Sequence, residues 1–284
     1  MERTLKETVY SPDSELLSFV KLLRGMWRDL LSSRDLAWRL LVRNISAQYR
    51  QSFLGYAWAF VPPIVTTAIW VFLNSQKILG IEDTGIPYPV FVLSGTVLWQ
   101  TFVEALNSPL QMVTQAKSML TKINFPREAL ILTGIGQIIF NFAIRALLLI
   151  IVIWWFGVSP HTSLLLVPFG VIALIGFGIA LGLLLTPLGM LYQDVGKILG
   201  FGTHVLFFLT PIIYPVPQSS WAAILVKLNP VTPLLQTTRD WLTTGQASQL
   251  HGFYLVCAIS LVLLFAAWVL FRIAMPHLIS RMSA

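Results

Sequence analysis

The feature that most constrains this chain is a basic amphipathic segment, residues 34–55, that continues without a break into an almost wholly apolar one, residues 56–73. At 100° per residue, one face of the first segment is apolar, and Arg39, Arg43 and Arg50 lie along its flank. A helix with this pattern lies in the headgroup plane of a membrane, with its apolar side toward the acyl chains. We therefore predict an interface helix that leads into a membrane-spanning helix, rather than a surface helix of a soluble domain. The apolar face comprises Trp38, Leu41, Val42, Ile45, Tyr49 and Phe53.

Three further expectations concern the residues before this helix. Ser32 stands three residues before Asp35, which predicts a capping box at the helix start. Ser14–Leu31 is expected to form an additional surface helix. No cleavable signal peptide is expected, because the first 30 residues are mixed and polar.

Composition places the chain among integral membrane proteins. Of its 284 residues, 56% are hydrophobic and only 11% are charged, whereas soluble domains carry about 25% charged residues. The single cysteine, Cys257, lies inside an apolar run, so no disulfide can form within the chain. One membrane domain is expected to account for most of the sequence.

Six apolar segments are long enough to be drawn as membrane-spanning helices, which predicts an all-α membrane protein. Two shorter patches, Trp221–Leu228 and Pro233–Leu242, are bounded by prolines and are predicted to be re-entrant or interfacial helices packed against protein. The expected organisation is an N-terminal region with the interface helix (1–55), a transmembrane domain (56–272) and a tail (273–284). The six segments are residues 56–75, 88–108, 129–156, 164–188, 198–214 and 252–272.

The distribution of basic residues predicts the orientation of these spans. Fifteen of the 19 Lys and Arg residues fall on one side, in residues 1–55, 109–128, 189–197 and the C-terminal residues from Arg272 onward. Only Lys77, Lys227 and Arg239 fall on the other side, and Arg145 lies inside a span. The positive-inside rule then places both termini in the cytoplasm and the loop 215–251 outside. The net charge of +7 therefore marks a membrane surface and is not an indication of nucleic-acid binding.

The sequence gives little support for catalysis on this chain. It has no phosphate-binding glycine loop, and its four histidines and one cysteine do not have the spacing of metal ligands. The outer loops offer few carboxylates for acid–base chemistry, namely Glu82, Asp83 and Asp240. We therefore expect no enzyme activity, no metal and no cofactor on this chain, and any ATP hydrolysis to occur on another one.

Two charged residues, Glu104 and Arg145, fall inside predicted spans. With the second span ending at residue 108, their depths would differ by roughly 18 Å, so no direct pair is expected. Arg145 should face protein or a water-filled cavity, as a structural anchor or as part of a transport path. Gly178 and Gly182 form a Gly-x-x-x-Gly pair, which predicts close helix packing within the monomer or a dimer.

Aromatic residues are numerous, and most are expected in interfacial belts or in the core. Some could instead line a path for sugars, because aromatic faces stack on sugar C–H surfaces. The candidates are Trp58, Trp70, Tyr88, Trp99, Phe207, Phe208 and Tyr214.

Several short elements occur in a fixed order along the chain: Arg34-Asp35-Leu36, Tyr49 to Gly55 with Trp58 and Pro62, Lys122 to Glu128, Tyr192-Gln193-Asp194-Val195, Thr210 to Pro215 and Asn229-Pro230. Together they resemble the elements of the ABC-2 polysaccharide-export permeases, the membrane subunits that export O-antigen, capsule or teichoic acid. Gln193 stands where the family usually has arginine, which weakens any inference of an ionic contact there, although Asp194 remains.

The resemblance implies a homodimer in the bacterial cytoplasmic (inner) membrane, paired with two copies of a cytoplasmic ATPase that binds ATP and Mg²⁺. A lipid-linked glycan would move along a channel at the dimer axis. Arg34, Arg39 and Arg43 would steer the lipid pyrophosphate or contact anionic lipid headgroups. Expected ATPase-coupling residues are Asp35, Arg43, Arg50, Gln115, Lys117, Lys122, Arg127, Glu128, Asp194 and Lys197.

Two other classes remain open at this stage. One is an ABC-2 permease for a drug or another lipid, which would share the topology. The other is a membrane scaffold or an integral-membrane enzyme, which would need no ATPase partner.

Overall fold

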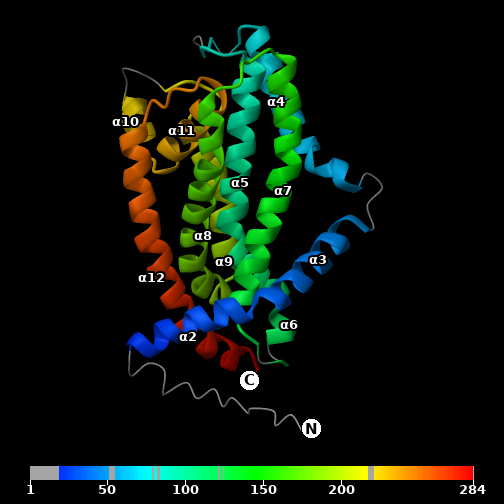
Figure 1. The fold of residues 1–284 in the computed structure, drawn as a ribbon, viewed down its shortest axis with the longest axis vertical. Coiled ribbons are helices and arrows are strands. Elements are labelled where there is room, and N and C mark those ends of the chain that lie inside the picture. Colours follow the sequence, from blue (N-terminus) through cyan, green and yellow to red (C-terminus); the bar gives the residue numbers. More distant parts are fainter. Residues whose placement is uncertain are drawn as a thin grey trace.

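The structure, a computed structural model, describes residues 19–50, 55–78, 80–81, 84–120, 122–123, 125–216 and 221–283. Within these ranges the chain is helical and contains no strand, in agreement with the all-α prediction (Figure 1). The elements are α2 (Phe19–Ser32), α3 (Arg34–Arg50), η1 (Gly55–Ala59), α4 (Val61–Ser75), α5 (Tyr88–Gln115), α6 (Lys117–Leu120), α7 (Glu128–Trp155), η2 (Thr162–Leu166), α8 (Val167–Leu191), α9 (Asp194–Leu209), α10 (Trp221–Leu228), α11 (Val231–Thr243) and α12 (Leu250–Ser283).

Five helical segments among the described residues are long and apolar enough to cross a membrane. They correspond to five of the six predicted spans: Ala57–Ser75, Tyr88–Gln115, Glu128–Trp155, Thr162–Leu191 and Leu250–Ser280.

The prediction of a sixth span at 198–214 is not confirmed. The helix in this region, α9, is only 16 residues long and ends at Leu209. It ends there because Thr210 is extended, with ψ of 135°, and because Pro211 follows with no N–H to donate. At about 1.5 Å per residue, α9 is roughly 24 Å long, which is less than the ~30 Å thickness of a hydrocarbon core.

Helix α5 lies at the centre of the bundle and is longer than predicted (Figure 1). The sequence analysis ended this span at residue 108, before Pro109, but the helix continues to Gln115 with Pro109 inside it. A helix break at this point would leave backbone groups without partners inside the bundle, a larger cost than the single hydrogen bond that proline removes. Most of α5 is buried, from Val90 to Val113.

The Gly178-x-x-x-Gly182 pair of α8 packs against α5, as the sequence predicted. A Cβ atom at Gly178 would lie 2.7 Å from Cβ of Ala105 and 2.9 Å from the carbonyl oxygen of Phe102. A Cβ atom at Gly182 would overlap the carbonyl oxygen of Leu106. Larger residues would therefore force α8 away from α5, so these glycines allow the close contact between the two helices.

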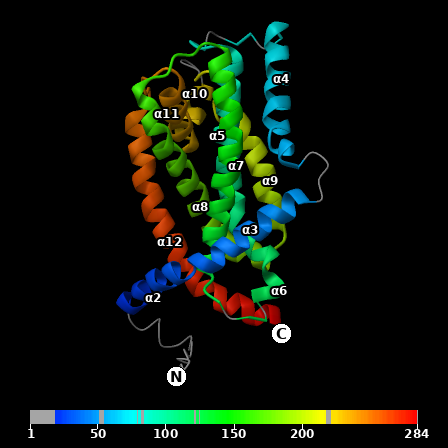
Figure 2. The same cartoon turned by 45° about the vertical axis from the view of Figure 1, so that its right-hand side comes forward.

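The two ends of the bundle have different coverings (Figure 1). At one end, here called the α2 end, lie α2, α6 and the last turns of α12. At the other, the α11 end, lie α10 and α11, the two short helices predicted from the proline-bounded patches. Figure 2 shows α4 standing at the side of the bundle, and Pro63 is its one buried residue.

The segment before the first span forms two consecutive helices, α2 and α3. The predicted capping box is wrong, because Ser32 belongs to α2 and its hydroxyl donates to the carbonyl oxygen of Asp29 at 3.1 Å. Ala37 and Leu40 form the buried face of α3, while Trp38 and Val42 of the predicted apolar face are exposed. Residues 14–18, Phe53, Glu82, Asp83 and the side chains of Tyr49 and Arg50 lie outside the described residues.

Candidate functional site

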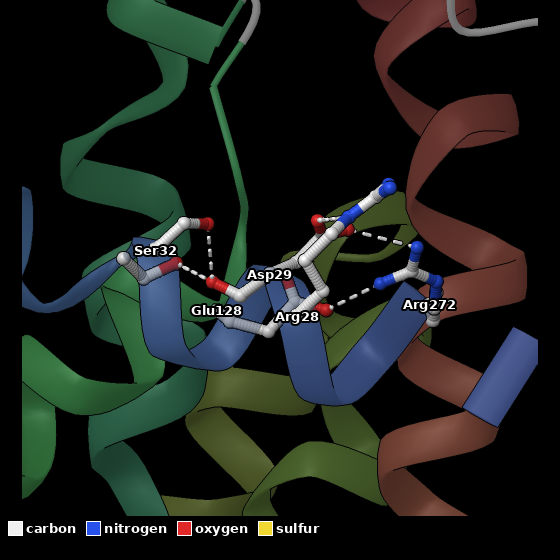
Figure 3. A network of polar contacts seen from close by, with 6 residues as sticks. Arg28, Asp29, Ser32, Glu128 and Arg272 are labelled. Carbon is white, nitrogen blue, oxygen red and sulfur yellow. Dashed lines mark hydrogen bonds and ion pairs between the residues drawn. The ribbon is translucent and has the colours of Figure 1, made fainter. Parts of the chain in front are cut away.

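The most prominent polar site at the α2 end is a cluster of two buried carboxylates, Asp29 and Glu128, and the mostly buried Arg272, called here the Arg272 cluster (Figure 3). Arg272 Nη1 donates to Glu128 Oε1 and Arg272 Nη2 donates to Asp29 Oδ2, each at 2.9 Å. The Asp29, Glu128 and Arg272 side chains are 8%, 5% and 12% exposed. One guanidinium therefore links three helices, α2, α7 and α12.

Each helix presents its charged residue for a local reason. Met26 and Asp29 are separated by three residues and lie on the buried face of α2, and Ser33, directly after the helix, is buried as well. Glu128 is the first residue of α7, where a carboxylate interacts favourably with the helix dipole. Arg272 stands at the predicted end of the last span and inside α12, because that helix continues to Ser283.

Two further arginines border the cluster. Arg28 Nε lies 3.7 Å from Asp29 Oδ1, with an exposed side chain. Arg127 precedes α7 and is half-buried. Burial lowers the pKa of Arg127, and the charge of Arg272 lowers it further, while Glu128 and Asp29 raise it. The carboxylates thus balance several cations in a confined space.

The predicted coupling residues separate into two groups. Gln115, Lys117 and Lys122 are exposed at the α2 end, on and beside α6. Glu128 is buried in the Arg272 cluster, so its contacts are internal and it does not lie on a docking surface. Charge reversal at Glu128 would therefore disturb helix packing as well as any coupling role.

The other predicted charged residues lie on the surface. Arg34, Asp35, Arg39 and Arg43 are exposed along α3, and Arg43 Nη2 donates to Asn44 Oδ1 at 3.2 Å. Asp194 and Lys197, at the start of α9, form an exposed ion pair of 3.1 Å. Arg50 is the last residue of α3.

Most of the aromatic candidates gather around α9 and the turn that follows it. The ring centroids of Trp99 and Phe207 are 6.1 Å apart, and those of Phe207 and Phe208 are 5.4 Å apart. Tyr88 Oη donates to the carbonyl oxygen of Ile213, and Tyr214 Oη donates to that of Phe208, at 3.0 and 2.6 Å.

The two tryptophans of the first span lie elsewhere. Trp58 is 55% exposed, and Trp70 packs against the core from α4.

Glu104 and Arg145 form an ion pair, which corrects the expectation that they lie at different depths. The error came from ending the second span at residue 108. Because α5 runs to Gln115 and α7 begins at Glu128, the two residues differ by only about 9 Å along the helix axes. An arginine side chain can bridge that difference.

An anchor at the α11 end was missed by the sequence analysis, which counted Arg239 as an ordinary loop charge. Arg239 is 4% exposed, and its Nη1 atom donates to the carbonyl oxygens of Pro211 and Ile212 at 3.0 and 3.4 Å. Its guanidinium lies 3.8 Å from the ring centroid of Phe91. Burial lowers its pKa to about 10, partly offset by Asp240.

Asn229 also holds the turn that follows α9. Asn229 Nδ2 donates to Thr210 Oγ1 at 2.8 Å, and Asn229 Oδ1 accepts from the Val231 amide at 3.0 Å. Two of the sequence elements that carry the family resemblance, Thr210 to Pro215 and Asn229-Pro230, therefore pack on each other.

These features define a multi-pass helical membrane protein with charged residues at one end and a proline-rich cap at the other. Residues 35–243 match the family described as ABC-2 type transporter. The chain belongs to this family, which confirms the resemblance inferred from the sequence elements.

Curated relatives cover most of the chain. The O-antigen export system permease protein RfbA of Myxococcus xanthus is 26% identical over 249 residues, which are 86% of this chain and 94% of that protein. A protein of the same name from Klebsiella pneumoniae is 24% identical over 209 residues, 72% of this chain and 78% of that protein. The polysialic acid transport protein KpsM of Escherichia coli is 22% identical over 245 residues, 82% and 91% of the two chains.

Proposed function

We propose that this chain is the membrane subunit of an ATP-driven exporter that moves a lipid-linked polysaccharide, of the O-antigen, capsule or teichoic-acid type, across the bacterial cytoplasmic membrane. The observation that carries the proposal is the family match over residues 35–243, together with relatives named for O-antigen export and polysialic acid transport. The drug-permease and scaffold alternatives have no comparable support.

The proposed orientation places the α2 end in the cytoplasm. It rests on the positive-inside rule, since most of the Lys and Arg residues belong to elements at this end. The α11 end then faces outward, with α10 and α11 as re-entrant or interfacial helices. In the proposed topology α9 is a sixth, short crossing that local bilayer thinning accommodates.

The proposed partner is a cytoplasmic ATPase, in two copies on a homodimer of this chain, with ATP and Mg²⁺ bound only by the partner. The exposed residues Gln115, Lys117 and Lys122 would form the main contact, and Asp194 with Lys197 a second one. Movement of α6 and the start of α7 would reach α2 and α12 through the Arg272 cluster, because that cluster joins all three helices.

The path of the glycan would lie at the dimer axis. Phe207 and Phe208 are candidates for stacking on sugar rings, and the buried Trp99 supports Phe207 from the core. Arg34 and Arg39 on α3 would meet the lipid pyrophosphate before entry, or bind lipid headgroups.

The test is reconstitution of the chain with its genomically neighbouring ATPase in lipid, with and without an undecaprenyl-linked glycan. We expect a stable complex whose ATP hydrolysis changes when the glycan is added. A Lys117→Glu, Lys122→Glu variant should insert normally but lose ATPase binding, whereas Lys227→Glu at the α11 end should bind as the wild type does. A stable complex that ignores the glycan would contradict the substrate, and absence of any complex would contradict the transporter assignment.

A further inference from the structure

The outward side of α5 is polar, although α5 is a membrane-spanning helix. Between Val90 and Val113, six positions of this helix are not buried, at residues 100, 103, 104, 107, 110 and 111. Four of the six are polar: Gln100, Glu104, Asn107 and Gln111. Their spacing of four, three and four residues places them on one face, and they extend for about 16 Å along the helix.

Other spans present apolar residues outward. Ile64 and Ile69 on α4, and Leu255 and Ile259 on α12, are exposed. These side chains suit acyl chains, whereas carboxylate and amide side chains inside the bilayer face protein or water. The polar side of α5 is therefore not a lipid-facing surface.

Helix α7 continues this polar surface. Gln137, Asn141 and Arg145 recur every four residues and so lie along one side of α7. Asn141 Nδ2 donates to Glu104 Oε2 at 3.3 Å, and Arg145 forms the ion pair with the same carboxylate. We call Gln100, Glu104, Asn107, Gln111, Gln137, Asn141 and Arg145 the α5–α7 stripe.

Each α7 member of the stripe has one buried polar atom that lacks a hydrogen-bond partner. These atoms are Gln137 Oε1, Asn141 Oδ1 and Arg145 Nη1. A buried polar atom without a partner costs about 1–3 kcal/mol, and in native proteins such atoms are usually satisfied by water or ligand. Three of them at regular spacing indicate a line of water or of exchangeable polar groups beside α7.

The opposite side of α7 gives an internal comparison. There α7, α8 and α12 enclose an apolar groove of about 600 Å³, lined by Ile135, Ile139 and Ile172 among others. One side of α7 thus borders an apolar groove and the other carries a polar stripe. Depth in the membrane alone therefore does not explain where the polar residues of α7 lie.

The charges of the stripe compensate one another. The Arg145 side chain is 4% exposed and lies behind the Glu104 side chain, which is 34% exposed. The remaining stripe residues are neutral amides, each with both donors and acceptors. Such a surface matches a hydroxyl-rich chain, which also carries donors and acceptors along its length.

We infer that the α5–α7 stripe is a water-lined wall of the transport path, along which the carbohydrate portion of the substrate passes while its lipid portion stays on apolar surfaces. This inference rests on the proposed function. It adds residues of α5 that the sequence analysis did not include among its path candidates.

The first test measures water access in the complete complex with its ATPase. In a Cys257→Ala background, single cysteines replace Gln100, Asn107 or Gln111, and a charged, membrane-impermeant methanethiosulfonate reagent is added. Because the thiolate is the reactive form, we expect modification roughly tenfold faster or more than at Ile139→Cys or Leu147→Cys. Both controls lie on exposed apolar positions of α7. Equal rates at stripe and control positions would overturn the inference.

The second test measures export in cells by the amount of surface glycan. Gln100→Leu combined with Asn107→Leu should reduce export several-fold, while Val103→Leu, on the same side of α5, should not. Each variant is included only if it co-purifies with the ATPase. Wild-type export by the double variant would overturn the substrate role. Thiol modification can be measured without any glycan. If the stripe cysteines react rapidly in a complex that exports no glycan, the stripe is lined by water and only the proposed function is refuted.

Discussion

One arginine holds each end of the bundle, and the groups that these two arginines contact differ. At the α2 end, Arg272 is paired with two carboxylates, Asp29 and Glu128. At the α11 end, Arg239 donates to the backbone carbonyl of Pro211 and lies over the ring of Phe91. The α2 end therefore depends on a balance of side-chain charges, whereas the α11 end depends on backbone acceptors that no substitution removes.

The largest effect is expected from Arg272→Met, which would leave two buried carboxylates without their cation. Removing one partner of a buried ion pair costs about 3–5 kcal/mol. We expect a corresponding fall in the thermal midpoint of the detergent-solubilised protein. Arg28→Met is the matched control, because its exposed pair with Asp29 should contribute less than about 1 kcal/mol.

The charge-balance explanation has its own test. Adding Asp29→Asn and Glu128→Gln to Arg272→Met should restore most of the lost stability, because no unpaired charge is then buried. A triple variant as unstable as Arg272→Met would show that packing, and not charge, makes the cluster important.

A smaller loss is expected from Arg239→Met, since its partners carry no net charge. Loss of hydrogen bonds from a charged donor costs about 1.5–3 kcal/mol. The thermal midpoint should fall less than for Arg272→Met, and exposed Lys227→Met should change it little. A fall larger than that of Arg272→Met would reverse the comparison.

A third effect, smaller again, concerns the contact between the two proline-containing turns at the α11 end. A double-mutant cycle of Asn229→Ala and Thr210→Val should give a coupling free energy of about 1 kcal/mol, the value of one buried hydrogen bond. Additive effects of the two substitutions would mean that this bond contributes nothing.

The smallest effect is expected from pH at Arg239. Its pKa of about 10 in the folded protein is below the ordinary value for arginine, so the unfolded chain binds this proton more tightly. The stability contribution of Arg239 should therefore rise only as pH increases above about 10. From pH 5 to 9, the difference in thermal midpoint between wild type and Arg239→Met should stay constant, and a drift across this range would contradict the assignment.

The features that local patterns encode were predicted from the sequence. Five apolar segments became membrane-length helices, and the proline-bounded patches became α10 and α11. The principal error in a span boundary was to end α5 before Pro109, because proline was taken to break a helix that tertiary packing in fact maintains. That one boundary also hid the Glu104–Arg145 pair.

Contacts between distant residues were not predictable in this way. Asp29 and Arg272 are separated by 243 positions, and no periodicity relates them. Arg239 was counted as an outer-loop charge because a loop composition gives no sign that α11 folds back over Phe91. The predicted roles in ATPase coupling remain predictions, and the structure adds only which of those side chains are exposed.

The separation between Asp29 and Arg272 also has a consequence for biosynthesis. At roughly 5–20 residues per second, a ribosome needs about 12–50 s to proceed from the first of these residues to the second. Throughout that interval Asp29 lacks the guanidinium that neutralises it in the finished bundle, and Glu128 lacks it from its own synthesis onward, over the last 144 positions. The ion pair that joins α2 to α12 therefore forms late. The spans that precede α12 enter the membrane before this pair can hold α2 against the bundle.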